Sequence, residues 1–478
     1  MSTLLDDKDS VIKTLRNIFR QAWPILISQW ASISFGVLDT AMTGHASPVD
    51  LAATALAVAI YISVYVGLMG VMHALIPIQA QFYGGGKHRD VGSAFSQGIW
   101  VALLLSVCGG MLMSFPDVWL SLSGDVEPAV RERLGQYLLV LTLGLPAALM
   151  FRTVYALANA VSRPKLFMMI NLVGVAIKAL LNWLLIFGNA GFPELGAVGA
   201  GIASVAVYWL SFSFGLWWVL RDPFYKRFEL KIRRPEFKGM WEILRLGVPM
   251  GASYMIEVSA FTFMALLIAN EGTAIIGGHQ ITANLAAFCY MMPMAIGVAT
   301  AALTAQAIGA QQHVLAHRTG MLGIGVTLAG ALLTSCVLIF GREYIVALYT
   351  NDMAVTTIAL SLLAILPWFH VIDSMQCANI YLLRAHKIAM MPLVLQTMSL
   401  TLVGLLGGWY FGFGPGQGQF EGVRHFMLSG SPPGAGTMWL MAAVGLGISA
   451  TLLHLFYRLI VYPRQLKSRL PKQPSQVA

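Results

Sequence analysis

The sequence has few charged residues, and this scarcity excludes an ordinary soluble protein. Asp, Glu, Lys and Arg together make up 11% of the 478 residues, whereas soluble domains average about a quarter. Hydrophobic residues make up 57% of the chain, and the mean hydropathy is +0.72. Apolar runs of about 20 residues, the length that a bilayer core requires, recur throughout. The composition therefore indicates an all-α integral membrane protein with many spans.

Cysteine is also rare, and the short motifs of common catalytic sites are absent. The four cysteines lie singly in apolar stretches, which argues against a disulfide framework or a zinc site. No HExxH, G-x-S-x-G or P-loop motif occurs. The acidic, polar N-terminus lacks the pattern of a signal peptide, so we expect no cleaved leader. We expect no cofactor, and an integral membrane enzyme becomes the least favoured class of function.

The chain repeats itself at an offset of 225 residues. The matches fall on residue types that apolar composition alone would not align: Arg20, Pro24, Ser28, Gln81, Gly84, His88 and Gly98 match Arg245, Pro249, Ser253, Gln306, Gly309, His313 and Gly323. Transporters built from such repeats bind their substrates near the midplane, at the interface of the two halves. We expect six-helix bundles at residues 1–220 and 241–478, joined by a linker at 221–240.

The apolar runs predict twelve spans. They lie at residues 16–44, 51–79, 93–115, 129–160, 166–188, 195–219, 241–269, 279–306, 317–340, 354–383, 389–412 and 437–461. A segment rich in glycine and proline, 412–436, is predicted to be a loop without a helix, and we expect it to cap the second bundle.

The basic residues predict how the spans are oriented. Lys and Arg gather at every second gap between spans, so the positive-inside rule places both termini and the linker in the cytoplasm. We expect the protein to lie in the cell inner membrane. An even number of spans in each half makes the repeats parallel, related by an axis along the membrane normal. The net charge of +9 is accounted for by this topology and by contact with the lipid bilayer, and we expect no nucleic-acid partner. Nothing in the sequence requires more than a monomer.

Three carboxylates stand out inside the predicted spans: Asp39, Glu257 and Asp373. A charge in hydrocarbon costs about 2.5–3.5 kcal/mol on insertion scales, so each acid calls for an explanation. The positions related to Asp39 and Glu257 by the repeat hold Met264 and Ser32, so the fold itself does not require these acids. We interpret all three as cation-coupling residues.

Helix rise places two of these acids together. At about 1.5 Å per residue, Glu257 and Asp373 lie at a similar depth near the midplane, and Asp39 lies higher in the first half. Neighbouring carboxylates in a medium of low dielectric hold a proton more readily, so the pair is suited to accept one. The same pair could instead supply two oxygen ligands to a sodium ion. A static role stays open for each acid, and for Asp39 the partner would be Lys178.

Aromatic and amide side chains surround Glu257 at helical spacing. Tyr254 and Phe261 fall on its face of the helix, and Gln280, Asn284 and Phe288 align in the next span. An acid with aromatics and amides suits an amphipathic cation, through charge, cation–π contact and adaptable hydrogen bonds. Each of these side chains could equally pack or join helices.

Arg152 and His370 have no single interpretation. Arg152 could snorkel or pair within the first bundle, and His370 could join a proton relay with Asp373 or bond a carbonyl group.

These residues resemble the bacterial NorM branch of the multidrug and toxic compound extrusion (MATE) family. The stretch WPILISQWASISFGVLDTAMTGH is similar to a family motif whose acid matches Asp39, and LGVPMGASYMIEVSAFTF is similar to one whose glutamate matches Glu257. The stretch GHQITAN, which ends at Asn284, and Asn182 before LLIFG also fit. Asp373 falls where the branch has an aspartate in its tenth span.

The resemblance implies two six-helix bundles around a V-shaped cleft, and drug export coupled to inward flow of protons or sodium ions. It also implies that Asn182 belongs to the substrate-binding set. In some members a tyrosine precedes the tenth-span aspartate by one turn and is associated with cation binding. Phe369 stands at that position here, so protons are favoured over sodium.

The sequence leaves three functions open. The first is a secondary antiporter that exports small amphipathic cations such as drugs and dyes. The second is a lipid-linked oligosaccharide flippase of the same superfamily, although those tend toward more spans and cationic cavities. The third and least favoured is an integral membrane enzyme.

Overall fold

The structure, a computed structural model, describes residues 2–120 and 127–463 and forms helices and turns, with no strand, over these ranges. The chain divides into two compact units, which we call the N-unit (Phe19–Val258) and the C-unit (Ser259–Ala478 together with Met1–Ile18). The boundary between the units falls inside one helix, whereas the linker predicted at 221–240 lies wholly in the N-unit. The division into bundles at 1–220 and 241–478 describes the sequence repeat and stays a prediction.

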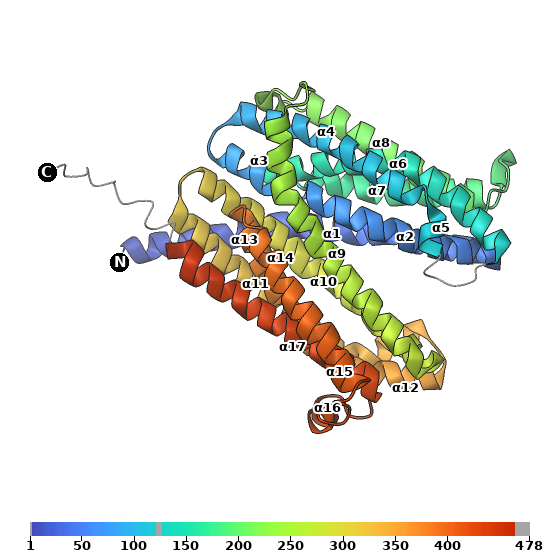
Figure 1. The fold of residues 1–478 in the computed structure, drawn as a ribbon. Coiled ribbons are helices and arrows are strands. Elements are labelled where there is room, and N and C mark those ends of the chain that lie inside the picture. The colour runs from blue at the N-terminus through green and yellow to red at the C-terminus, as the bar shows by residue number, and fades with distance from the viewer. Residues whose placement is uncertain (1, 121–126, 464–478) are drawn as a thin grey trace. The chain divides into compact units, whose positions relative to one another are not determined.

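The helices follow one another in the order shown in Figure 1. The first nine are α1 (Ser2–Ala46), α2 (Pro48–Met72), α3 (Leu75–Gly84), α4 (His88–Met113), α5 (Pro116–Leu120), α6 (Pro128–Ala160), α7 (Lys165–Ile186), α8 (Ala197–Arg221) and α9 (Phe237–Ile268). The others are α10 (Thr273–Gly309), α11 (His313–Tyr349), α12 (Met353–Leu362), α13 (Leu366–Ala385), α14 (Met390–Met398), α15 (Gly408–Gly412), α16 (Glu421–Met427) and α17 (Pro433–Phe456). Short 3₁₀ turns lie at η1 (Asn189–Gly191), η2 (Tyr225–Phe228) and η3 (Ala269–Glu271), and π-helical segments at η4 (Ser399–Gly407) and η5 (Tyr457–Val461).

The predicted number of spans is confirmed. Among the described residues, eleven helical segments are long and apolar enough to cross a membrane, and α12 and α13 together make a twelfth. The sequence predicted this tenth span as one segment at 354–383, but the structure bends it by 47° between the two helices. Pro367 stands in the first turn of α13. Because proline has no N–H to donate and clashes with the preceding turn, it begins a new helix there and does not continue the old one.

One helix forms the centre of each unit. In the N-unit, α6 packs against α2, α4 and α8, and Figure 1 shows α4, α6 and α8 running side by side. In the C-unit, α10 packs against α11, α12 and α13. Both central helices carry long buried runs with many alanines, such as 294–302 of α10. Small side chains let helices approach closely where lipid offers no hydrophobic drive for association.

The linker is bound along α4. The Ser96 hydroxyl accepts the N–H of Arg233 at 2.7 Å, and the Gln97 side chain bonds the carbonyl of Arg234 and the N–H of Glu236. A β-carbon at Gly92 would lie 2.0 Å from the carbonyl oxygen of Phe228, so only glycine admits the linker at this distance. The linker therefore fixes the start of α9 to the N-unit.

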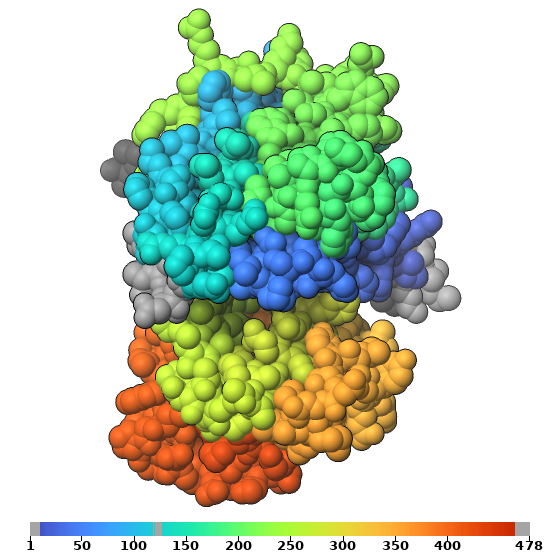
Figure 2. All heavy atoms as spheres, turned by 90° about the vertical axis from the view of Figure 1, so that its right-hand side faces the viewer, coloured from blue at the N-terminus to red at the C-terminus, as the bar shows by residue number. Residues whose placement is uncertain are grey.

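The segment 412–436 contains a helix that its composition did not predict. Within it lies α16, where the buried Arg424 guanidinium binds the carbonyl of Ser431. The carboxylate of Glu271 accepts the N–H groups of Gly434 and Ala435 at 2.9 and 2.7 Å, at the start of α17. Figure 2 shows the segment, coloured orange-red, at the surface of the C-unit. The glycine content of the segment did not predict this helix, because the helix depends on the contact of the buried Arg424 with Ser431.

Candidate functional site

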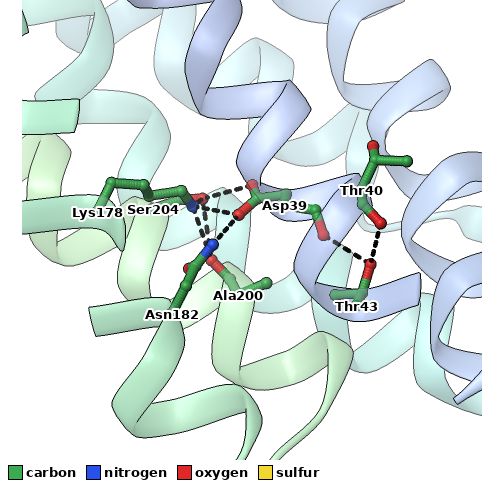
Figure 3. Close-up of polar contacts among 7 residues, drawn as sticks. All are labelled: Asp39, Thr40, Thr43, Lys178, Asn182, Ala200 and Ser204. Atoms are coloured by element: carbon green, nitrogen blue, oxygen red, sulfur yellow. Dashed lines mark hydrogen bonds and ion pairs between the residues drawn. The ribbon is translucent and has the colours of Figure 1, made fainter. Parts of the chain in front are cut away.

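Asp39 of α1 lies in a buried polar network with residues of α7 and α8 in the N-unit (Figure 3). The Lys178 ammonium lies 2.7 Å from Oδ1 of Asp39, and their side chains are 1% and 6% exposed. The Ser204 hydroxyl donates to the other carboxylate oxygen at 3.4 Å. Lys178 also donates to the carbonyl of Ala200 at 3.1 Å and to the Ser204 hydroxyl. The static partner that the sequence left open for Asp39 is therefore in place.

Asn182 belongs to the same network. Its amide donates to Oδ1 of Asp39 at 2.8 Å, and the side chain is fully buried. The backbone carbonyl of Asp39 accepts a further bond from the Thr43 hydroxyl at 2.7 Å (Figure 3). Asn182 thereby orients the carboxylate of Asp39, and its contact with substrate stays a prediction.

The predicted residues on α9 divide between the two units. Tyr254 is buried in the N-unit, where its hydroxyl lies 3.3 Å from Nδ1 of His73. Glu257 is half-buried in the same unit, one residue before its end at Val258. Phe261 belongs to the C-unit, so the unit boundary separates two side chains that the sequence placed on one helix face.

Asp373 is buried in the C-unit, in the middle of α13. It is 7% exposed, and His370, one turn earlier, is 1% exposed. Within the described part of the chain, Nε2 of His370 has no hydrogen-bond partner. The structure places Glu257 and Asp373 in different compact units, so their pairing stays a prediction.

Aromatic rings lie close to this part of α13. Phe369 contacts Trp439 edge-on, with ring centroids 5.1 Å apart, and Phe261 contacts both rings at about 6 Å. The Trp439 indole donates to Nδ1 of His279 at 3.2 Å. Trp439 was not predicted, because its position in the last span gives no sign that it packs against the tenth. Only the packing of α17 against α13 reveals it.

The amide side chains of α10 share one exposed face. Gln280, Asn284 and Phe288 are all exposed, in agreement with their predicted alignment. An amide that faces lipid would lack hydrogen-bond partners, so this spacing suits a surface that water reaches. Their contact with substrate stays a prediction.

A family model described as MatE matches residues 24–184 and 249–410, two segments whose starts reproduce the 225-residue offset. The chain belongs to the MATE family. Its members are transporters, so an integral membrane enzyme is excluded.

Individual proteins agree with this MATE assignment. The chain is 37% identical to the probable multidrug resistance protein NorM of Aromatoleum aromaticum, over 86% of this chain and 89% of that protein. It is 33% identical to the protein of the same name from Neisseria meningitidis serogroup A, over 84% and 88% of the two chains. The crystal structure of the eukaryotic MATE transporter AtDTX14 matches with a TM-score of 0.85 at 20% identity, over 96% and 98%. The predicted NorM resemblance and the twelve-span MATE fold are both confirmed.

Proposed function

We propose that this MATE protein is a secondary active antiporter that exports small amphipathic cations in exchange for protons. The observation that carries the proposal is the burial of Asp373 in the middle of α13, one turn from the buried His370. A carboxylate beside an imidazole is suited to take up and release a proton. Sodium stays a second candidate ion, with Glu257 and Asp373 as its carboxylate ligands.

An aromatic group in the same unit as Asp373 supports a cationic substrate. Phe261, Phe369 and Trp439 present aromatic rings within about 6 Å of one another. Aromatic faces attract organic cations most strongly where water is excluded, and a carboxylate nearby adds charge attraction. Gln280 and Asn284, exposed on α10, would supply adaptable hydrogen bonds to varied substrates.

The relatives support export of drugs. Both proteins reported above carry the name probable multidrug resistance protein NorM. By the same reasoning we propose a location in the bacterial inner membrane as a monomer, with both termini and the linker in the cytoplasm. Cysteine accessibility at the linker, probed from each side of the membrane, tests this orientation.

The experiment is dye export from vesicles that contain the purified protein. The pH gradient and the sodium gradient are varied independently, and the dye is a fluorescent amphipathic cation. One proton moving down one pH unit contributes about 1.4 kcal/mol, enough for roughly tenfold accumulation of the dye. We expect the pH gradient alone to drive export, whereas export driven only by sodium would replace the proton with sodium.

Three variants assign the coupling residues. We expect Glu257→Gln and Asp373→Asn each to abolish export while the protein still inserts and folds. Glu343→Gln removes an exposed carboxylate of α11 and serves as the matched control, with export unchanged. Full export by both coupling variants would refute the assignment of these two acids.

A further inference from the structure

Arg152 is a second buried cation of the N-unit, and it lacks the counterion that Lys178 has. Its side chain lies in α6 and is 8% exposed. Within residues 2–120 and 127–463, no carboxylate forms an ion pair with it, whereas Lys178 pairs with Asp39 at 2.7 Å. Burial of an uncompensated charge is costly, so a residue of this kind calls for a partner.

Tyrosines surround the Arg152 guanidinium in place of an acid. Nε of Arg152 donates to the Tyr65 hydroxyl at 2.9 Å, and the guanidinium carbon lies 5.7 Å and 5.6 Å from the ring centres of Tyr65 and Tyr155. Tyr61 stacks on Tyr65 at 5.2 Å, and Tyr61 interacts electrostatically with Tyr208 of α8. We call Arg152 and these four tyrosines the Arg152 cluster.

Two polar atoms of the Arg152 cluster are buried and have no hydrogen bond within the described part of the chain. They are Nη1 of Arg152 and the hydroxyl of Tyr155. Tyr61 and Tyr155 are 7% and 1% exposed, whereas Tyr65 and Tyr208 are only half-buried. The cluster therefore combines buried donors without acceptors with two rings that reach the accessible surface.

These donors match one kind of ligand group. A guanidinium presents its N–H groups as a fork that fits a carboxylate, and tyrosine hydroxyls donate to carboxylate oxygens. The flanking rings would pack against an aryl group next to that carboxylate. We propose that the Arg152 cluster is a substrate subsite for the aryl carboxylate of transported compounds that also carry a cationic group. The proposal rests on the proposed export function and adds a determinant of specificity to it.

A matched pair of dyes tests the subsite. Rhodamine B carries an aryl carboxylate and a delocalised cation, and in rhodamine B methyl ester a neutral methyl ester replaces the carboxylate. Both are measured in export from vesicles and in equilibrium binding to the purified protein, for the wild type and for Arg152→Gln, Arg152→Lys and Arg342→Gln. Arg342 is exposed on α11 and controls for the loss of one arginine.

We expect Arg152→Gln to weaken binding and raise the KM for rhodamine B about tenfold or more, the effect of losing about 1.4 kcal/mol. Export of the ester should stay at the wild-type level. Arg152→Lys should restore part of the rhodamine B binding, because it keeps the charge but not the fork. Arg342→Gln should match the wild type for both dyes.

Other outcomes overturn the proposal. An equal loss of both dyes in Arg152→Gln would make Arg152 a residue that only holds the helices together. Unchanged handling of both dyes would remove it from binding altogether. Chloride is also added to the binding assay as a competitor. If it displaces rhodamine B from the wild type but not from Arg152→Gln, and export of the two dyes does not differ, the site binds inorganic anions and not substrate. If the wild type exports neither dye, the export function itself fails, and the ester separates that result from a failure of the subsite alone.

Discussion

The buried ion pair between Asp39 and Lys178 allows one prediction to be worked in detail. At an effective dielectric constant of about 20, unit charges 2.7 Å apart attract by about 6 kcal/mol. Desolvation of both ions, several kcal/mol each, offsets most of this gain. The intact pair is therefore close to neutral for stability. Removing one partner leaves the other charge buried alone, which costs about 3–5 kcal/mol.

The perturbation is a double-mutant cycle with Asp39→Asn, Lys178→Met and the double variant. Asp39→Asn leaves an ammonium that is 1% exposed without a counterion, so we expect the full loss of about 3–5 kcal/mol. At roughly 2–4 °C per kcal/mol, the thermal midpoint in detergent should fall by about 10 °C. The double variant removes both charges and should recover most of this loss, which gives a coupling energy of about 3 kcal/mol.

The matched control is an ion pair of similar length at the surface. Arg131 and Asp117 lie 2.6 Å apart, but their side chains are 57% and 69% exposed. Surface pairs contribute about 0–1 kcal/mol, so Asp117→Asn should leave the midpoint nearly unchanged. An Asp39→Asn protein with the wild-type midpoint would refute the reasoning and would leave Asp39 free for a coupling role.

Dye export by the same variants then separates stability from coupling. If Asp39 only holds the helices together, the double variant should recover export along with stability. If Asp39 is also a coupling residue, the double variant should be stable and inactive. The two functions proposed for this acid therefore predict different results in a single protein.

Three further predictions follow from contacts described above. Gly92→Val should displace the linker from α4, because its β-carbon would lie 2.0 Å from the Phe228 carbonyl oxygen; limited proteolysis should then cut the linker faster than in the wild type. Glu271→Gln should lower the thermal midpoint by a few degrees. The Glu271 carboxylate binds the first N–H groups of α17 and complements the helix dipole, a contribution of about 1 kcal/mol. An unchanged midpoint would contradict this. His386 lies just beyond the end of α13, where burial and then two neighbouring histidines lower its pKa to about 4 from its usual 6.5. The unfolded chain then binds more protons between these values, so stability should fall as the pH drops from 6.5 toward 4, and His386→Gln should make that fall shallower.

The sequence predicted the number of spans and the repeat because both depend on local pattern. A run of about 20 apolar residues crosses a bilayer whatever surrounds it. The repeat was visible because glycine, proline and glutamine at fixed offsets cannot arise from hydrophobic composition alone. The bend before Pro367 was missed because a proline within an apolar run does not by itself show whether a helix kinks or restarts.

The sequence named the acids of the candidate site and offered Lys178 as a static partner of Asp39, but it could not show that the two side chains meet. Asp39 and Lys178 are separated by well over a hundred residues, and each lies in a helix that is apolar on most sides. The periodicity of such helices does not predict which sides pack against each other, because no polar stripe marks the outer side. Nothing in the sequence distinguishes Ser204, since a serine among small residues is an ordinary packing residue in a membrane helix.

Lys178 and Arg152 show what packing adds to a list of buried charges. In the sequence both are single cations within apolar helices, and neither has an acid at helical spacing that would settle its role. In the N-unit, Asp39 neutralises Lys178. Arg152 instead contacts tyrosines, and its Nη1 has no acceptor among the described residues. Two different results therefore follow from removing a single charge. Asp39→Asn should lower stability and with it the export of every substrate, whereas Arg152→Gln should leave the fold intact and reduce export only of compounds that carry a carboxylate.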